Sequence, residues 1–128
     1  MRRLALGVFL VLHGLVHVWY VVLSHGWVEV EDQMGWNGHS WLLSSVLSAD
    51  TILAVASVLY VAVTLGFVAG GVGYALSSGW ATGLLVGTAL LSTVVLVAMW
   101  DGRFDLLVEK GVVGVLINLA LVAWLVAQ

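Results

Sequence analysis

Hydrophobic residues fall into four long runs that are separated by short polar stretches. The runs cover residues 4–24, 51–76, 81–100 and 107–127. Each run reaches about 20 residues, which is the length an α-helix needs to cross the hydrocarbon core of a bilayer. The pattern therefore predicts an all-α polytopic membrane protein with four transmembrane helices.

The stretch between the first two runs, residues 25–50, has a different character. Its acidic residues cluster at positions 29–32 and cannot lie in hydrocarbon, so we expect an extramembrane loop. Trp41–Ser48 regain hydrophobicity, and we predict a short interfacial helix there. Asp50 is expected to cap a helix that begins at Thr51.

The two remaining connections, Ser77–Trp80 and Asp101–Asp105, are too short to cross the bundle. Consecutive helices must then be antiparallel neighbours, so residues 1–128 are predicted to form one domain, an up-down four-helix bundle. The pair Arg2 and Arg3 at the N-terminus sets the orientation by the positive-inside rule. We expect both termini in the cytoplasm and the membrane to be a prokaryotic plasma membrane.

The composition excludes several classes of protein. Hydrophobic residues make up 62% of the chain, charged residues 9%, and the mean hydropathy is +1.15, values that a soluble domain does not reach. With four Lys and Arg and a net charge of -3, no basic patch can neutralise a phosphate backbone, so nucleic-acid binding is excluded. The absence of Cys excludes disulfide and thiolate chemistry.

Two histidines interrupt the first hydrophobic run. His13 and His17 are one helical turn apart on one face, with His13 near the expected midplane of the membrane. Asn118 reaches a similar depth in the fourth run, and Asp50 lies nearer the level of His17. These four residues are the candidate ligand-binding site. Three hydroxyl residues lie within about two turns of the same depth: Ser57, Thr88 and Ser92.

Three interpretations of His13 and His17 stay open. Neutral imidazoles can hydrogen-bond polar groups of other helices and hold the bundle together. The pair can instead contribute two ligands to a metal ion or, with Asn118, line a pocket for a quinone or a lipid. Haem is disfavoured because both histidines lie on one helix face. Four further residues could complete a metal shell: Asp50, Glu109, His25 and His39.

Small residues recur at helical spacing in the second and third runs. Gly66-x-x-x-Gly70 and Gly83-x-x-x-Gly87 allow two helix backbones to approach closely. We expect both motifs to pack spans two and three against each other. A seam between two copies of the chain is the alternative.

Four motifs support a resemblance to a known group of proteins. They are "LVLHGLVHV" in the first run, "GHSWLL" before the second, "LLSTVVLVAMWDGRF" closing the third and "KGVVGVLINLALV" in the fourth. In this layout the chain resembles small four-helix membrane proteins that are broadly DoxX-like. The resemblance implies the architecture, and some DoxX-like proteins have been linked to quinol oxidation.

Two classes of function remain at this point. The preferred one is a non-enzymatic integral membrane protein whose bundle binds a lipophilic ligand, a second copy of itself or a partner membrane subunit. The alternative is a metal- or quinone-dependent membrane oxidoreductase that uses His13 and His17. No nucleophile–base pair or zinc-protease signature in the sequence supports the alternative.

The expected orientation can be tested by cysteine labelling in intact cells. A membrane-impermeant reagent should label a cysteine that replaces Asp32 or Gly102, and should not label one that replaces Ser78. The reverse labelling pattern would overturn the orientation and leave the number of spans unaffected.

Overall fold

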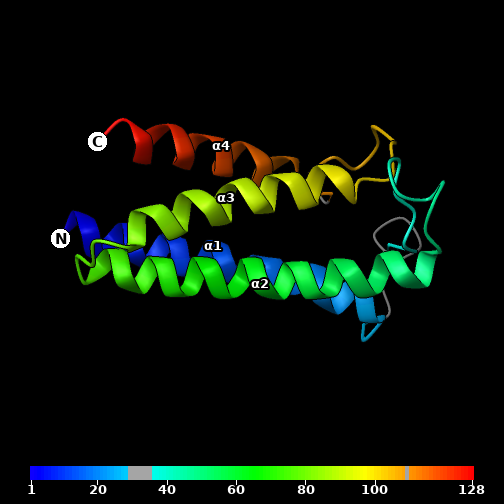
Figure 1. Ribbon diagram of the computed structural model, residues 1–128, viewed down its shortest axis with the longest axis horizontal. Helices are drawn as coiled ribbons and strands as arrows, with labels where there is room; N and C mark the ends of the chain where they lie inside the picture. Colours follow the sequence, from blue (N-terminus) through cyan, green and yellow to red (C-terminus); the bar gives the residue numbers. More distant parts are fainter. Residues whose placement is uncertain (29–35, 109) are drawn as a thin grey trace.

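The computed structural model describes residues 1–28, 36–108 and 110–128, so the acidic cluster at 29–32 and Glu109 lie outside the described residues. The described residues form helices and turns and contain no strand (Figure 1). The four helices are α1 (Arg2–His25), α2 (Ala49–Ala75), α3 (Ala81–Ala98) and α4 (Val112–Val126). The all-α prediction is confirmed. The helices α1, α2 and α3 are long and apolar enough to cross a membrane.

Both termini lie at one end of the molecule, here called the termini end, and the long connections lie at the opposite loop end (Figure 1). The helices pack in chain order, α1 on α2, α2 on α3 and α3 on α4. Within the described part of the chain, α4 approaches no other helix backbone as closely as that of α3. The predicted up-down course is therefore observed, and which side of the membrane holds the termini stays a prediction.

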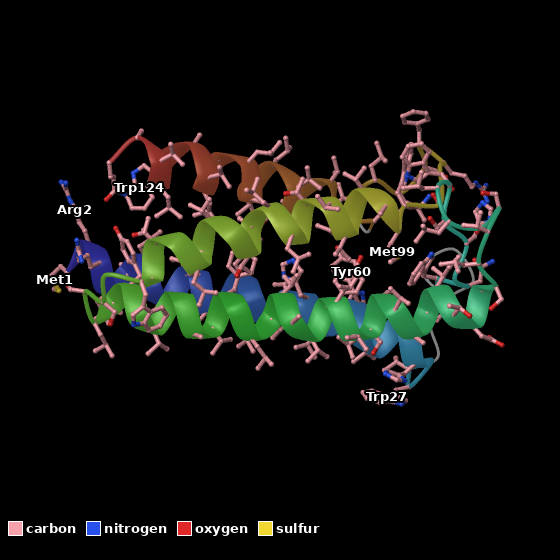
Figure 2. All side chains as sticks on the ribbon, in the orientation of Figure 1. Met1, Arg2, Trp27, Tyr60, Met99 and Trp124 are labelled. Carbon is pink, nitrogen blue, oxygen red and sulfur yellow. The ribbon has the colours of Figure 1, made fainter. Side chains whose placement is uncertain are left out.

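Buried apolar side chains form two clusters between the helices. One cluster contains Leu10, Phe67 and Leu85, and the other, nearer the loop end, contains Tyr60 and Met99. Figure 2 shows Tyr60 pointing from α2 into the space below α3, whereas Trp27 points away from the bundle at the loop end. The core thus continues along the bundle, and the site described below lies where its two clusters meet.

Glycines bring α1 and α2 into direct backbone contact. A Cβ at Gly7 would lie 2.7 Å from both the Ala75 Cβ and the Gly71 carbonyl oxygen. A Cβ at Gly14 would lie 2.6 Å from the Phe67 Cβ. Only hydrogen fits at these positions, because real Cβ atoms do not approach other carbons so closely.

The two glycine motifs predicted to join spans two and three have different surroundings. Gly66 lies against Thr88, and a Cβ at Gly70 would lie 2.6 Å from Leu85 Cδ2, so the first motif packs α2 on α3. A Cβ added at Gly83 or Gly87 would meet no described atom within 4 Å, and both residues are outside the buried core. The expected use of this second motif within the chain is therefore wrong.

The segment before α2 forms consecutive turns over residues 41–46, where an interfacial helix was predicted. Its polar groups instead cap α3. The Ser40 hydroxyl donates to the Ala98 carbonyl, and Trp41 donates from its backbone N–H to the Trp100 carbonyl (2.9 Å) and from Nε1 to the Val97 carbonyl (2.7 Å). Because the last carbonyls of a helix have no partner inside it, these bonds stabilise the end of α3.

Asp50 is not the cap of α2. The N-cap is Ser48, whose hydroxyl accepts a hydrogen bond from the Thr51 backbone N–H at 3.3 Å. Asp50 lies in the first turn of the helix, where a carboxylate is favoured by the helix dipole.

The fourth helix begins at Val112 and not at residue 107. Leu106 and Gly111 have left-handed backbone angles, with φ of 51° and 96°, and such angles interrupt an α-helix. The 15 residues of α4 rise about 22 Å, which is less than the ~30 Å of a hydrocarbon core. The turns that precede α4 therefore occupy the depth at which the sequence predicted its first helical turns.

The tight α1–α2 contact predicts a contrast between two glycine substitutions. Gly14→Ala should lower the stability of the protein by about 1–3 kcal/mol, because the new methyl group overlaps Phe67. Gly87→Ala is the matched control, since its methyl group meets open space. Thermal unfolding in detergent measures both, and equal effects of the two substitutions would refute this account of the packing.

Candidate functional site

Polar side chains from α1, α3 and α4 meet inside the bundle in one hydrogen-bonded network. His13 Nε2 lies 2.9 Å from Asn118 Oδ1, and Asn118 Nδ2 lies 2.8 Å from Ser92 Oγ. Ser92 Oγ in turn lies 2.7 Å from His17 Nε2. Finally, His17 Nδ1 lies 3.1 Å from the backbone carbonyl oxygen of His13, which closes the circuit.

The carbonyl oxygen of His13 fixes the direction of every bond in this network. A carbonyl only accepts, so His17 Nδ1 carries a hydrogen and, in the neutral ring, its Nε2 accepts. Ser92 then donates to His17 and accepts from the Asn118 amide group. The Asn118 oxygen is left to accept from His13 Nε2–H. The network is thus satisfied by neutral histidines of defined tautomer.

The network is enclosed by protein. His17 exposes 2% of its surface and His13 7%, while Asn118 and Ser92 are fully buried. The Phe67 ring of α2 packs against both imidazoles, with centroid distances of 4.9 Å to His13 and 5.6 Å to His17. Both histidines therefore face the interior, as their shared helix face predicted.

This arrangement is suited to holding helices together rather than to moving protons. Two of its members, the Asn118 amide and the His13 carbonyl, do not exchange a proton with their neighbours as an imidazole or a hydroxyl does. What the bonds do provide is a link from α1 to both α3 and α4. In hydrocarbon, interhelical hydrogen bonds of this kind contribute to association.

Two kinds of contact therefore build the bundle, and they act on different pairs of helices. The helices α1 and α2 meet through glycines, where van der Waals contact of backbones is the attractive term. The contact of α4 with α1 is made instead by side chains that bridge a wider separation. The α1–α2 contact is therefore expected to lose stability when a glycine gains a side-chain atom. The α1–α4 contact is expected to lose stability when a hydrogen bond is removed.

The other predicted site residues lie elsewhere. Asp50 borders a shallow pocket of about 260 Å³ with Ser24 and His25 at the loop end. It is ten residues from Tyr60, the α2 residue beside His17, and so is about 15 Å away along the helix. His25 bonds Ser57 at 2.7 Å and stacks on Trp27. Asp50 is thus separate from the three residues that the network joins.

The histidine pair gains no third metal ligand from the described part of the chain. Among the residues that the structure describes, no group of three or more His, Asp or Glu side chains could hold an ion. His39 lies in the loop, where its Nδ1 is 3.3 Å from Ser44 Oγ. The position of Glu109 falls outside the described residues.

A groove that the sequence did not predict opens at the loop end, between the end of α3 and the turns before α4. It has a volume of about 320 Å³, and its lining is almost wholly apolar. Seven apolar side chains form its walls: Leu96, Val97, Trp100, Phe104, Leu107, Val112 and Val115. Gly111 also lines it, and a Cβ at this glycine would lie 2.8 Å from the Tyr20 hydroxyl of α1.

Lys110 lines the groove, and three further charged residues lie around its side chain; together the four are called the rim. Lys110 Nζ lies 2.9 Å from Asp101 Oδ2 and 3.0 Å from Asp105 Oδ1, and it also reaches the Arg103 carbonyl at 3.4 Å. Arg103 Nε is 3.5 Å from Asp105 Oδ1. The hydrogen bond from Lys110 lowers the pKa of the Asp105 carboxyl, so this group is ionised at neutral pH. Two cations therefore balance two anions.

No protein-family model, curated protein or solved structure matches the chain. The DoxX-like resemblance therefore stays a prediction.

Removing one member of the network should cost more than removing a bonded pair. Asn118→Leu should lower stability by about 1–2 kcal/mol, because His13 Nε2–H loses its acceptor and Ser92 loses a donor. Adding His13→Phe to Asn118→Leu should recover part of that loss, since the unpaired donor is removed. Unfolding in mixed micelles, followed by circular dichroism, gives the coupling between the two sites.

Asp50→Asn is the control, because Asp50 lies outside the network. Strict additivity of the His13 and Asn118 substitutions, or an Asn118→Leu protein as stable as the wild type, would contradict the proposed connectivity.

Proposed function

We propose that this chain is a non-enzymatic, four-span integral membrane protein that binds a lipid-like molecule in the groove between α3 and the start of α4. The observation that carries the proposal is the groove itself. It combines an apolar lining with a charged rim, which is the combination that an amphiphilic ligand requires.

The position of the groove supports a ligand from the bilayer. Trp100 and Phe104 border it, and Phe104 exposes 80% of its surface. Tryptophan concentrates at the boundary between hydrocarbon and headgroups, because its ring is apolar and its N–H is polar. An acyl chain could enter from the hydrocarbon while its headgroup stays beside Lys110 and the other charged residues.

In this proposal the buried histidines have a supporting role. Among the described residues, the backbone of α4 comes close only to that of α3, and the bond from His13 to Asn118 adds an attachment of α4 to α1. By fixing α4, the network fixes Val112 and Val115, which form one wall of the groove. The fourth span, α4 with the turns before it, is part of the same proposal.

The alternative, a metal- or quinone-dependent oxidoreductase that uses His13 and His17, has less support. His17 uses both ring nitrogens in the network, and His13 uses Nε2. Binding a metal or a quinone through Nε2 of either ring would break the circuit and leave Asn118 or Ser92 unpaired in a buried site, at a cost of about 1–3 kcal/mol.

Lipid retention tests the proposal. Wild-type protein released from lipid nanodiscs into native mass spectrometry should keep one bound lipid. Val112→Trp should lose most of it, because an indole at this position fills the groove.

Val113→Trp is the matched control, because Val113 is the next residue of the same helical turn, is exposed and does not line the groove. Retention that is equal in the two variants, or no bound lipid in the wild type, would refute the proposed function.

A further inference from the structure

The charged residues at the rim of the groove differ in how many of their hydrogen-bonding groups are already used. Lys110 is already satisfied, because its ammonium group has three N–H donors and three acceptors lie within 3.4 Å of Nζ. Its side chain exposes only 20% of its surface. Lys110 therefore holds the turn together and has no donor left for a ligand.

Arg103 and Asp105 are exposed and have donor or acceptor atoms that could bind a headgroup at the rim. Their side chains expose 74% and 53% of their surfaces. The guanidinium group has five N–H donors, and its contact with Asp105 is the 3.5 Å approach of Nε to Oδ1. In the Asp105 carboxylate, Oδ1 contacts both Lys110 and Arg103, while Oδ2 has no partner among the described residues.

A donor for an anion and an acceptor for a cation thus lie side by side. From this complementarity we infer that the groove binds a zwitterionic phospholipid with a primary ammonium headgroup, whose phosphate meets Arg103 and whose ammonium meets Asp105. The inference rests on the proposed function and adds the class of lipid to it.

The balance of charges disfavours an anionic lipid. Asp101 and Asp105 offset Lys110 and Arg103, so the rim carries no net positive charge among the described residues to attract a lipid with a net negative one. A phosphatidylglycerol headgroup would gain Arg103 and would gain nothing from Asp105. Phosphatidylethanolamine gains both contacts.

The carboxylate also distinguishes an ammonium from a choline. A primary ammonium has three N–H donors and can form a charge-assisted hydrogen bond to Asp105 Oδ2. A quaternary choline has no N–H and can approach the carboxylate only as a diffuse charge. The distinction requires no difference in the acyl chains, which would contact the apolar walls of the groove in either case.

A headgroup competition tests the inference on the intact protein. The protein is reconstituted into nanodiscs with equal amounts of phosphatidylethanolamine, phosphatidylcholine and phosphatidylglycerol that share the same acyl chains. Retained lipid is then identified by native mass spectrometry. We expect phosphatidylethanolamine to be retained about threefold to fivefold over each of the other two, the upper part of the range expected for exposed ion pairs.

Two variants and one control test whether Asp105 and Arg103 cause the headgroup preference. Asp105→Asn should abolish the preference for phosphatidylethanolamine over phosphatidylcholine, while Arg103→Gln should reduce the retention of both. Asp50→Asn, an exposed acidic residue at the same end of the molecule and outside the groove, should change nothing.

The outcomes distinguish a failure of the headgroup preference from a failure of the proposed function. Lipid that is retained in a manner sensitive to Val112→Trp, but without headgroup preference or with preference for phosphatidylglycerol, overturns the inference and leaves the proposed function intact. A preference that survives Asp105→Asn also overturns it. Absence of retained lipid overturns both.

Discussion

The buried carbonyl oxygen of His13 determines which groups donate and which accept in the hydrogen bonds that join α1 to α3 and α4. Among helices whose surroundings are as apolar as their side chains, burying leucine and valine provides little directional preference, so polar contacts select the packing. The His13 carbonyl accepts a hydrogen bond from His17 Nδ1, so His17 Nε2 accepts from Ser92. Ser92 in turn accepts from the Asn118 amide, whose oxygen accepts from the ring of His13. All four bonds form in the observed arrangement of α1, α3 and α4, in which Val112 and Val115 of α4 line the groove.

The sequence predicted most of the fold and only part of the site, for identifiable physical reasons. Hydropathy located α1, α2 and α3 because length and apolarity are local properties of the chain. The inward face of His13 and His17 followed from the cost of an unpaired imidazole in hydrocarbon. The partner Ser92 could not be selected from Ser57 and Thr88, since depth alone does not determine which helix faces converge.

Three sequence predictions differ from the structure: the cap of α2, the helix before it and the start of α4. In each case the outcome depends on neighbouring parts of the chain. Ser48 and Asp50 are both good N-cap residues, and the choice depends on where the preceding turns place the chain. Residues 41–46 stay in turns because the free carbonyls of α3 use Ser40 and Trp41 as donors. The late start of α4 needs Gly111 in a left-handed conformation, which the sequence permits without requiring.

The saturation of the buried network also explains why binding is proposed at the edge of the bundle. A polar group inside hydrocarbon is stable only when its bonding capacity is used, and a group whose capacity is used has little left for a ligand. His17 and Ser92 illustrate this at the centre, as Lys110 does at the rim. Arg103 and Asp105 lie where water and headgroups can satisfy the unused atoms, so they can remain partly unpaired at little cost. In the proposed function, a polar headgroup is therefore recognised by the most exposed charges of the rim, and the buried histidines contribute by holding α4, which forms one of the apolar walls.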